Sequence, residues 1–275
     1  MKRPIIIAGP CVAESYALLE EVLQALQALE TRLPFQLVFK ASFDKANRTS
    51  LHSYRGPGMD TVLDWFSQLK TKYGCKILTD IHERAHVEEV AKVVDYLQIP
   101  AFLCRQTDLV VAAAQSGCGV NIKKGQFMAP EAMAPILAKA QAAKKTPEQE
   151  IWVTERGFAF GYGDLVVDMR SFHTLAQTGV PVLFDITHST QQPPAGKETA
   201  ISNAQRCYAP LLARSAIATG SVNGAFLEVH PNPAQAKSDA AAQLSIPQAT
   251  ALLEQIIPML HQATAWKGID TQFTS

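Results

Sequence analysis

Short runs of apolar residues alternate along the chain with longer segments in which apolar positions recur every three or four residues. The short runs are rich in Ile, Val, Leu and Phe without strict polar alternation, which is typical of strands buried on both faces of a parallel sheet. Eight runs predict strands, at residues 5–9, 36–42, 76–80, 96–100, 120–124, 151–156, 180–185 and 225–230.

The longer segments predict helices. Residues 14–29, for example, carry their leucines and Val22 on one stripe. The predicted helices span residues 14–29, 59–73, 87–94, 107–116, 129–144, 169–177, 204–218 and 248–266. The alanine-rich stretch 234–242 predicts one further short helix.

Eight strand–helix units in 275 residues fit a single-domain α/β fold, the (β/α)8 TIM barrel, over residues 1–275. A doubly wound sheet is the alternative by pattern alone. Its usual GxGxxG turn after the first strand is absent, which favours the barrel.

Composition narrows the function classes. The chain has 25 basic and 25 acidic residues, and this balance disfavours nucleic acid as a partner. Its five cysteines form no CxxC pair, so neither a disulfide framework nor a zinc finger is indicated. No apolar stretch reaches the roughly 18–20 residues needed to cross a membrane. We therefore expect a cytoplasmic protein with no membrane partner.

The reactive face of such a barrel lies at the carboxyl ends of its strands, and cations collect there in this sequence. The cations are Lys40, Lys45, Arg48, Lys123 and Arg156. A cation inside an apolar strand is costly unless an anion meets it, so the pattern favours a phosphorylated, anionic substrate. The alternative is structural pairing with nearby acids, namely Asp44, Asp80, Glu155 or Asp185.

A second group of strand-end residues has the chemistry of metal ligands: Cys11, His188, Glu228 and Asp239. A thiolate, an imidazole and two carboxylates suit Zn²⁺, Fe²⁺ or Mn²⁺. Their spacing forms no local motif, and a buried cysteine such as Cys11 is more often a small apolar core residue than a ligand.

Longer segments of the chain resemble the 3-deoxy-D-manno-octulosonate 8-phosphate synthases, in order from about residue 4 to 265. The segments are AGPCVAES (8–15), FKASFDKANRTS (39–50), QIPAFLCRQTD (98–108), NIKKGQF (121–127), TERG (154–157), DITH (185–188) and EVHPNP (228–233). The resemblance implies condensation of phosphoenolpyruvate with D-arabinose 5-phosphate and water, with release of phosphate, in lipopolysaccharide biosynthesis. It also implies a homotetramer.

The resemblance assigns roles to residues of this chain. Those implied to hold the phosphate and carboxylate of phosphoenolpyruvate are Lys40, Ser42, Lys123 and Arg156, with Lys45, Gln98 and Ala101 nearby. Asn47 and Arg48 are implied to meet the arabinose phosphate, Arg48 in a neighbouring subunit's site, and Asp80 the sugar hydroxyls. Lys45, Asn47, Asp80 and His188 are the candidate catalytic residues, and Gln191 matches a position near the metal.

Metal-free members of this family carry Asn at the position of Cys11, so the resemblance places the chain among the metal-requiring members. Whether the metal orients water or the aldehyde oxygen stays open. Residues 189–203 depart from the family, which has a more glycine-rich loop there.

Two other functions stay open from sequence. The sister synthases that use erythrose 4-phosphate carry Lys-Pro-Arg-Thr where this chain reads KANRT at 45–49, so Asn47 disfavours them. A non-catalytic barrel that only binds sugar phosphates is disfavoured because the predicted metal ligands and anion-binding residues are all present.

Overall fold

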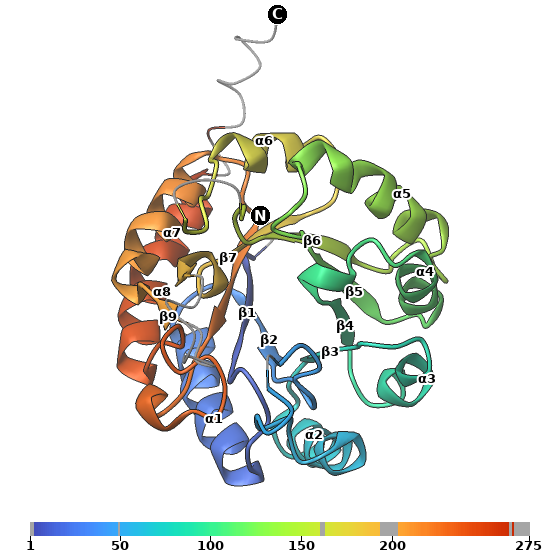
Figure 1. Ribbon diagram of the computed structural model, residues 1–275. Helices are drawn as coiled ribbons and strands as arrows, with labels where there is room; N and C mark the ends of the chain where they lie inside the picture. Colours follow the sequence, from blue (N-terminus) through green and yellow to red (C-terminus); the bar gives the residue numbers. More distant parts are fainter. Residues whose placement is uncertain (1–2, 49, 160–162, 193–202, 264–265, 267–275) are drawn as a thin grey trace, which may run out of the picture.

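The computed structural model describes residues 3–48, 50–159, 163–192, 203–263 and 266, and its eight parallel strands close into a barrel surrounded by helices (Figure 1). The strands are β1 (Ile5–Gly9), β2 (Gln36–Lys40), β3 (Ile77–Asp80), β4 (Tyr96–Ile99), β5 (Gly119–Lys123), β6 (Ile151–Glu155), β7 (Val182–Asp185) and β10 (Gly224–Glu228). Around the barrel they follow the order β1-β10-β7-β6-β5-β4-β3-β2. The predicted (β/α)8 barrel is confirmed, and the doubly wound sheet is wrong.

Eight helices of the described residues cover the outside of the barrel. They are α1 (Tyr16–Arg32), α2 (Met59–Tyr73), α3 (His86–Ala91), α4 (Thr107–Gln115), α5 (Ala134–Ala142), α6 (Arg170–Ala176), α7 (Ala209–Ala218) and α8 (Ile246–Ala263). Each lies within or close to a predicted helix. The 129–144 and 204–218 segments start later as α-helix because a 3-10 turn precedes each, at Pro130–Met133 and Arg206–Tyr208.

The short helix predicted over 234–242 is wrong. Only Pro233–Gln235 form a 3-10 turn there, and Asp239 has a φ of 45°. A right-handed helix cannot continue through a left-handed residue. The alanines raised the helix propensity, but this segment is fixed instead by contacts with the barrel end.

One inward-facing layer of apolar side chains fills the barrel interior. It consists of Ile5, Ile7, Val38, Leu78, Tyr96, Trp152, Leu183 and Phe226. Because strand side chains alternate between two faces, the residue two positions after an inward one also points inward. On six strands that next residue is polar: Lys40, Asp80, Gln98, Thr154, Asp185 and Glu228. The apolar layer therefore supports a polar layer at the carboxyl ends of the strands.

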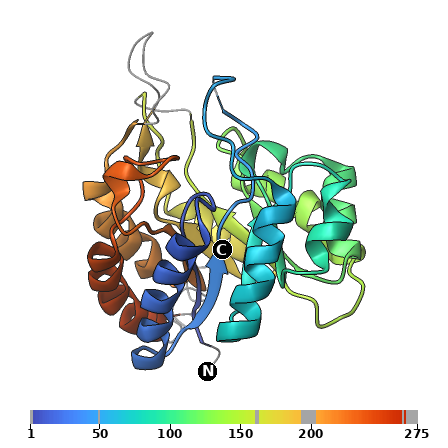
Figure 2. The same cartoon turned by 90° about the horizontal axis from the view of Figure 1, so that it is seen from below.

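Figure 2 shows the segment that follows β2 at the end of the barrel opposite the N-terminus. After β7, the short strands β8 (Gln191–Gln192) and β9 (Asn203–Ala204) pair antiparallel. All five cysteines are free, as the sequence predicted. Among the described residues, no helix combines the length and apolar character needed to span a membrane.

Candidate active site

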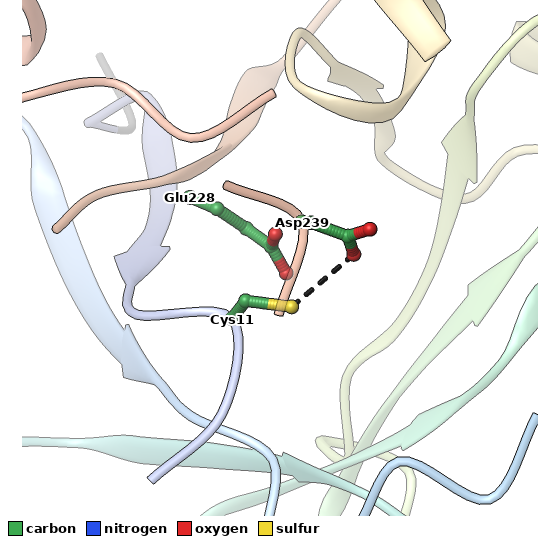
Figure 3. Close-up of side chains that lie close together, drawn as sticks. All are labelled: Cys11, Glu228 and Asp239. Atoms are coloured by element: carbon green, nitrogen blue, oxygen red, sulfur yellow. Dashed lines mark hydrogen bonds between the residues drawn. The ribbon is translucent and has the colours of Figure 1, made fainter. Parts of the chain in front are cut away.

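Three of the four predicted metal ligands converge at the carboxyl end of the barrel. One ligand atom each of Cys11, Glu228 and Asp239 lies within 4.8 Å of the others. Figure 3 shows these side chains pointing toward one another, with Cys11 Sγ 3.2 Å from Asp239 Oδ2. Cys11 follows β1 and Glu228 ends β10, which are neighbours in the barrel, so residues over 200 positions apart meet.

His188, the fourth predicted ligand, borders this group without belonging to it. Its Nε2 lies 3.7 Å from Glu228 Oε1 and 3.8 Å from Asp239 Oδ2. Its Nδ1 lies 2.8 Å from Asp185 Oδ2 and donates its proton to that carboxylate. This hydrogen bond orients the ring and turns Nε2 toward the two acids, the arrangement usual for a metal-binding histidine.

The chemistry of this cluster fits a divalent cation. Glu228 Oε2 is buried and has no hydrogen-bond partner among the described residues. Burial and the nearby Glu228 raise the pKa of the Cys11 thiol well above its ordinary value. A cation between these groups stabilises the thiolate and compensates the buried carboxylates, which are costly without a partner.

A segment after β10 holds the cluster in place. Ser238 Oγ lies 3.1 Å from Cys11 Sγ, and the fully buried Gln243 accepts the backbone N–H of Cys11 at 3.2 Å. Gln243 also donates to the carbonyl of Ser238. The sequence did not reveal the roles of Ser238 and Gln243, because their contacts with Cys11 join segments more than 200 positions apart.

Two of the predicted cations form buried ion pairs. Lys40 Nζ donates to Glu228 Oε1 at 2.9 Å and to the carbonyl of Cys11 at 3.0 Å. Lys123 pairs with Asp185 and lies 3.2 Å from the centre of the Phe226 ring. Structural pairing therefore accounts for part of the cationic pattern. The sequence suggested Asp185 only as a pairing partner for a cation, but this residue contacts both Lys123 and His188.

Arg156 and Gln191 connect the cations with the metal-ligand group. Arg156 donates to Gln191 Oε1 at 2.6 Å, while Gln191 Nε2 lies 3.4 Å from Asp239 Oδ1. Arg156 Nε is buried and has no hydrogen-bond partner among the described residues. A buried guanidinium with an unused donor is ready to bind an anion.

Lys45, Ser42 and Asp80 form a second polar group beside the first. Lys45 donates to Ser42 Oγ at 2.9 Å, and Ser42 donates to Asp80. Burial opposes the charge on Lys45, but surrounding acidic groups, with Cys11 first among them, outweigh it and raise its pKa. Burial likewise opposes ionisation of Asp80, but Lys40 and Lys45 outweigh it and lower its pKa. Both groups are therefore charged near neutral pH.

A chain of hydrogen bonds crosses four neighbouring strands and fixes Asp80. Gln98 donates to Asp80 at 2.7 Å, Asn121 donates to Gln98 at 2.8 Å, and Thr154 donates to Asn121 at 2.7 Å. Asn121 was not assigned from sequence, although its place in an apolar strand was a usable signal. These fully paired amides hold the acid in one orientation.

The remaining predicted residues lie around this centre. Asn47 is exposed in the turn after β2, and Arg48 donates to the carbonyls of Tyr54 and Lys237 at 3.2 and 3.0 Å. Ala101 is buried in the 3-10 turn Ala101–Leu103 after β4. Within the divergent loop 189–203, residues 193–202 lie outside the described residues.

A parallel barrel whose strand ends bring together buried cations and a cation-ready group of thiol and carboxylates defines a class, the barrel enzymes that act on anionic substrates. Residues 2–263 match the DAHP synthetase I family, and the chain belongs to it.

Relatives named "2-dehydro-3-deoxyphosphooctonate aldolase" are similar along most of the chain. The Fusobacterium nucleatum protein is 50% identical over 238 residues, which cover 86% of this chain and 84% of that protein. The Variovorax paradoxus protein is 47% identical, covering 92% and 89% of the two chains, and the Helicobacter hepaticus protein 48%, covering 92% and 95%.

Proposed function

We propose that this protein condenses phosphoenolpyruvate with D-arabinose 5-phosphate and water to give 3-deoxy-D-manno-octulosonate 8-phosphate and inorganic phosphate, a step toward the Kdo of lipopolysaccharide. One observation carries the proposal: Lys123, Arg156 and Lys45 lie around the Cys11, Glu228 and Asp239 group in a chain 50% identical to an enzyme with the corresponding name. It is an aldol-type transferase dependent on phosphoenolpyruvate.

The cations bring two anionic substrates together against their mutual repulsion. Arg156, with its unused Nε donor, and Lys123 are placed to bind the phosphate and carboxylate of phosphoenolpyruvate. Lys40, Ser42, Gln98 and Ala101 complete this region. Since Lys40 and Lys123 already neutralise Glu228 and Asp185, Arg156 and Lys45 supply most of the positive charge that remains for substrate.

The sugar phosphate is placed by the segment after β2. Asn47 and Arg48 lie on that segment, where Asn47 reaches a sugar phosphate at the outer edge of the site and Arg48 reaches the one in a neighbouring subunit's site. Asp80 accepts hydrogen bonds from sugar hydroxyls deeper in the barrel. The methylene carbon of phosphoenolpyruvate then forms a bond to the aldehyde carbon. Water adds to the neighbouring carbon, and phosphate leaves with its bridging oxygen.

Proton movements during these steps involve groups of this chain. Lys45 keeps its proton at Nζ, next to Ser42, and stabilises negative charge that develops on the aldehyde oxygen. His188, whose Nδ1 is bonded to Asp185, presents Nε2 to the centre of the site.

Cys11, His188, Glu228 and Asp239 are the residues that would hold a divalent metal, Zn²⁺, Fe²⁺ or Mn²⁺. Such an ion polarises an oxygen of the aldehyde or lowers the pKa of a water. Cys11 supports the metal-requiring class. One barrel domain over residues 1–275, a homotetramer and a cytoplasmic location complete the proposal and stay predictions.

The decisive experiment measures phosphate release from phosphoenolpyruvate with arabinose 5-phosphate and with erythrose 4-phosphate, each with and without chelator. We expect phosphate release with arabinose 5-phosphate but not with erythrose 4-phosphate, and we expect the chelator to abolish it. Preference for erythrose 4-phosphate would support the DAHP synthase alternative of the same family, which Ala46 and Asn47 disfavour. Release with neither sugar, with divalent metal present, would support the non-catalytic sugar-phosphate-binding barrel.

A further inference from the structure

A cavity of about 390 Å³ opens between α7 and α8, on the outer layer of the barrel and separate from the proposed active site. The two helices lie side by side in Figure 1. Leu244 and Leu252 form part of an apolar floor, and Arg206, Arg214, Gln248 and Gln255 supply polar groups. The cavity shares none of these residues with the proposed active site and is therefore a separate site.

The charge of the cavity is one-sided. Among the described residues, two arginines line it and no Asp or Glu does. Arg206 donates to the carbonyl of Gln243 at 2.9 Å, and Arg214 to the side-chain oxygen of Gln255 at 3.2 Å. Both acceptors are neutral, so neither hydrogen bond cancels the charge of a guanidinium.

Ala209 and Pro210, the first two residues of α7, also line the cavity. They offer no free N–H group, because the Ala209 N–H donates to the carbonyl of Arg206 and proline has none. The polar character of the cavity therefore comes from its side chains. Two guanidiniums over an apolar floor match an anionic head group joined to an apolar body.

We propose that this cavity binds a small carboxylate with an apolar body. Its volume falls within the roughly 300–1,000 Å³ usual for small-molecule sites. The carboxylate lies between Arg206 and Arg214, and the apolar body contacts Leu244 and Leu252.

The site has a direct connection to the reaction centre. The carbonyl that Arg206 contacts belongs to Gln243, and the side chain of Gln243 accepts the backbone N–H of Cys11. A ligand bound to Arg206 is therefore linked through Gln243 to Cys11, a member of the Cys11, Glu228 and Asp239 group.

Cys207 offers a built-in reporter because it lines the cavity and is exposed, whereas Cys11, Cys75 and Cys104 are buried and Cys118 is half-buried. The experiment measures the alkylation rate of Cys207 in the full-length protein with iodoacetamide, by mass spectrometry. The probe is 4-phenylbutyrate, with its neutral amide and inorganic phosphate as comparison ligands. At ten times its dissociation constant, the carboxylate should slow alkylation about elevenfold.

The variant Arg214→Gln should lose this protection, and Arg32→Gln should keep it. Arg32 is a matched control because it is also exposed and contacts α8, through Glu254, but does not line the cavity. Equal protection by the neutral amide, or none by the carboxylate up to solubility, would overturn the proposal. Slower alkylation of Cys207 at higher protein concentration, with no ligand added, would also overturn the proposal. A second copy of the chain would then be the occupant of the cavity.

Discussion

Lys40 Nζ lies 2.9 Å from Glu228 Oε1, and the two side chains are 1% and 0% exposed. This ion pair joins β2 to β10 across β1 in the barrel interior. Burial opposes ionisation of Glu228, but Lys40 and His188 outweigh it and lower its pKa. The pair thus keeps a proposed metal ligand ionised although its side chain is buried.

Replacement of one partner should cost far more than replacement of both. Lys40→Met leaves the Glu228 carboxylate buried without its cation, and we expect the free energy of unfolding to fall by about 3–5 kcal/mol. In Lys40→Met/Glu228→Gln no charge remains unpaired, so part of that loss should be recovered. Urea unfolding of the three proteins measures both effects. A double variant less stable than Lys40→Met would contradict the importance of the pair.

Cys11→Asn should reduce the metal requirement. The substitution removes the thiol from the group of three and leaves Glu228 and Asp239 with a neutral amide. We expect the purified variant to contain less zinc, iron and manganese, and to keep a larger share of its activity after chelation than the parent. Cys207→Asn is the matched control, because Cys207 is exposed and is not part of the Cys11, Glu228 and Asp239 group. Equal metal content in parent and Cys11→Asn would argue against Cys11 as a ligand.

Asp80 should contribute to stability in a pH-dependent way. Its pKa in the folded protein is lowered, so its contribution is complete above the unfolded pKa of about 3.9 and is lost as pH falls through the folded value. Asp80→Asn should therefore be less stable than the parent by a constant amount between pH 7 and 5. Below about pH 4 the difference should shrink. Urea unfolding across this range tests the prediction.

The control for Asp80 is Asp64→Asn on α2. Asp64 is exposed and bonded only to Gln68 among the contacts that the structure describes. This variant should stay within about 0.5 kcal/mol of the parent at every pH. The stability difference between Asp80→Asn and the parent should not grow as pH falls. Such growth would have the wrong sign for a carboxyl with a lowered pKa.

The strands and the polar ring could be predicted from the sequence because both depend on local pattern. An apolar run long enough to cross the barrel shows where each strand ends. Val38 and Phe226 point into the barrel, so the residue two positions after each of them must point inward as well. Lys40 and Glu228 were therefore identified before their contact was known.

The segment 234–242 could not be predicted, because its conformation depends on residues far along the chain. Its alanines favour a helix locally, but Gln243 bonds to Cys11 and Leu244 bonds to the backbone of Glu228. These contacts fix Asp239 at a φ of 45°. Pairing shows the same limit. The sequence placed Lys123 and Asp185 at strand ends, but it did not reveal the hydrogen bond that His188 donates to Asp185.

Arg48→Gln should weaken arabinose 5-phosphate selectively. Loss of a charge-assisted contact with phosphate costs about 1.5–3 kcal/mol, or roughly 10- to 150-fold in kcat/KM for the sugar. The KM for phosphoenolpyruvate should change little, because Lys123 ends β5 and Arg156 directly follows β6, away from the segment that carries Arg48. Arg55→Gln is the matched control, since Arg55 lies on the same segment but pairs with Asp44. Equal effects on both substrates would show a general disturbance of the segment.

Asp185→Asn should lower metal affinity although Asp185 is not a proposed ligand. The carboxylate accepts the His188 Nδ1 proton and pairs with Lys123, so it both orients the ring and makes Nε2 a better donor. Loss of such a partner typically costs 10- to 100-fold in metal affinity. Titration of the metal-stripped protein with Zn²⁺ measures this directly. Glu155→Gln is the matched control, because Glu155 is equally buried and paired with Lys124 but does not contact His188. If both variants lost affinity equally, the loss would come from a disturbed barrel interior, and Asp185 would have no special role in positioning His188.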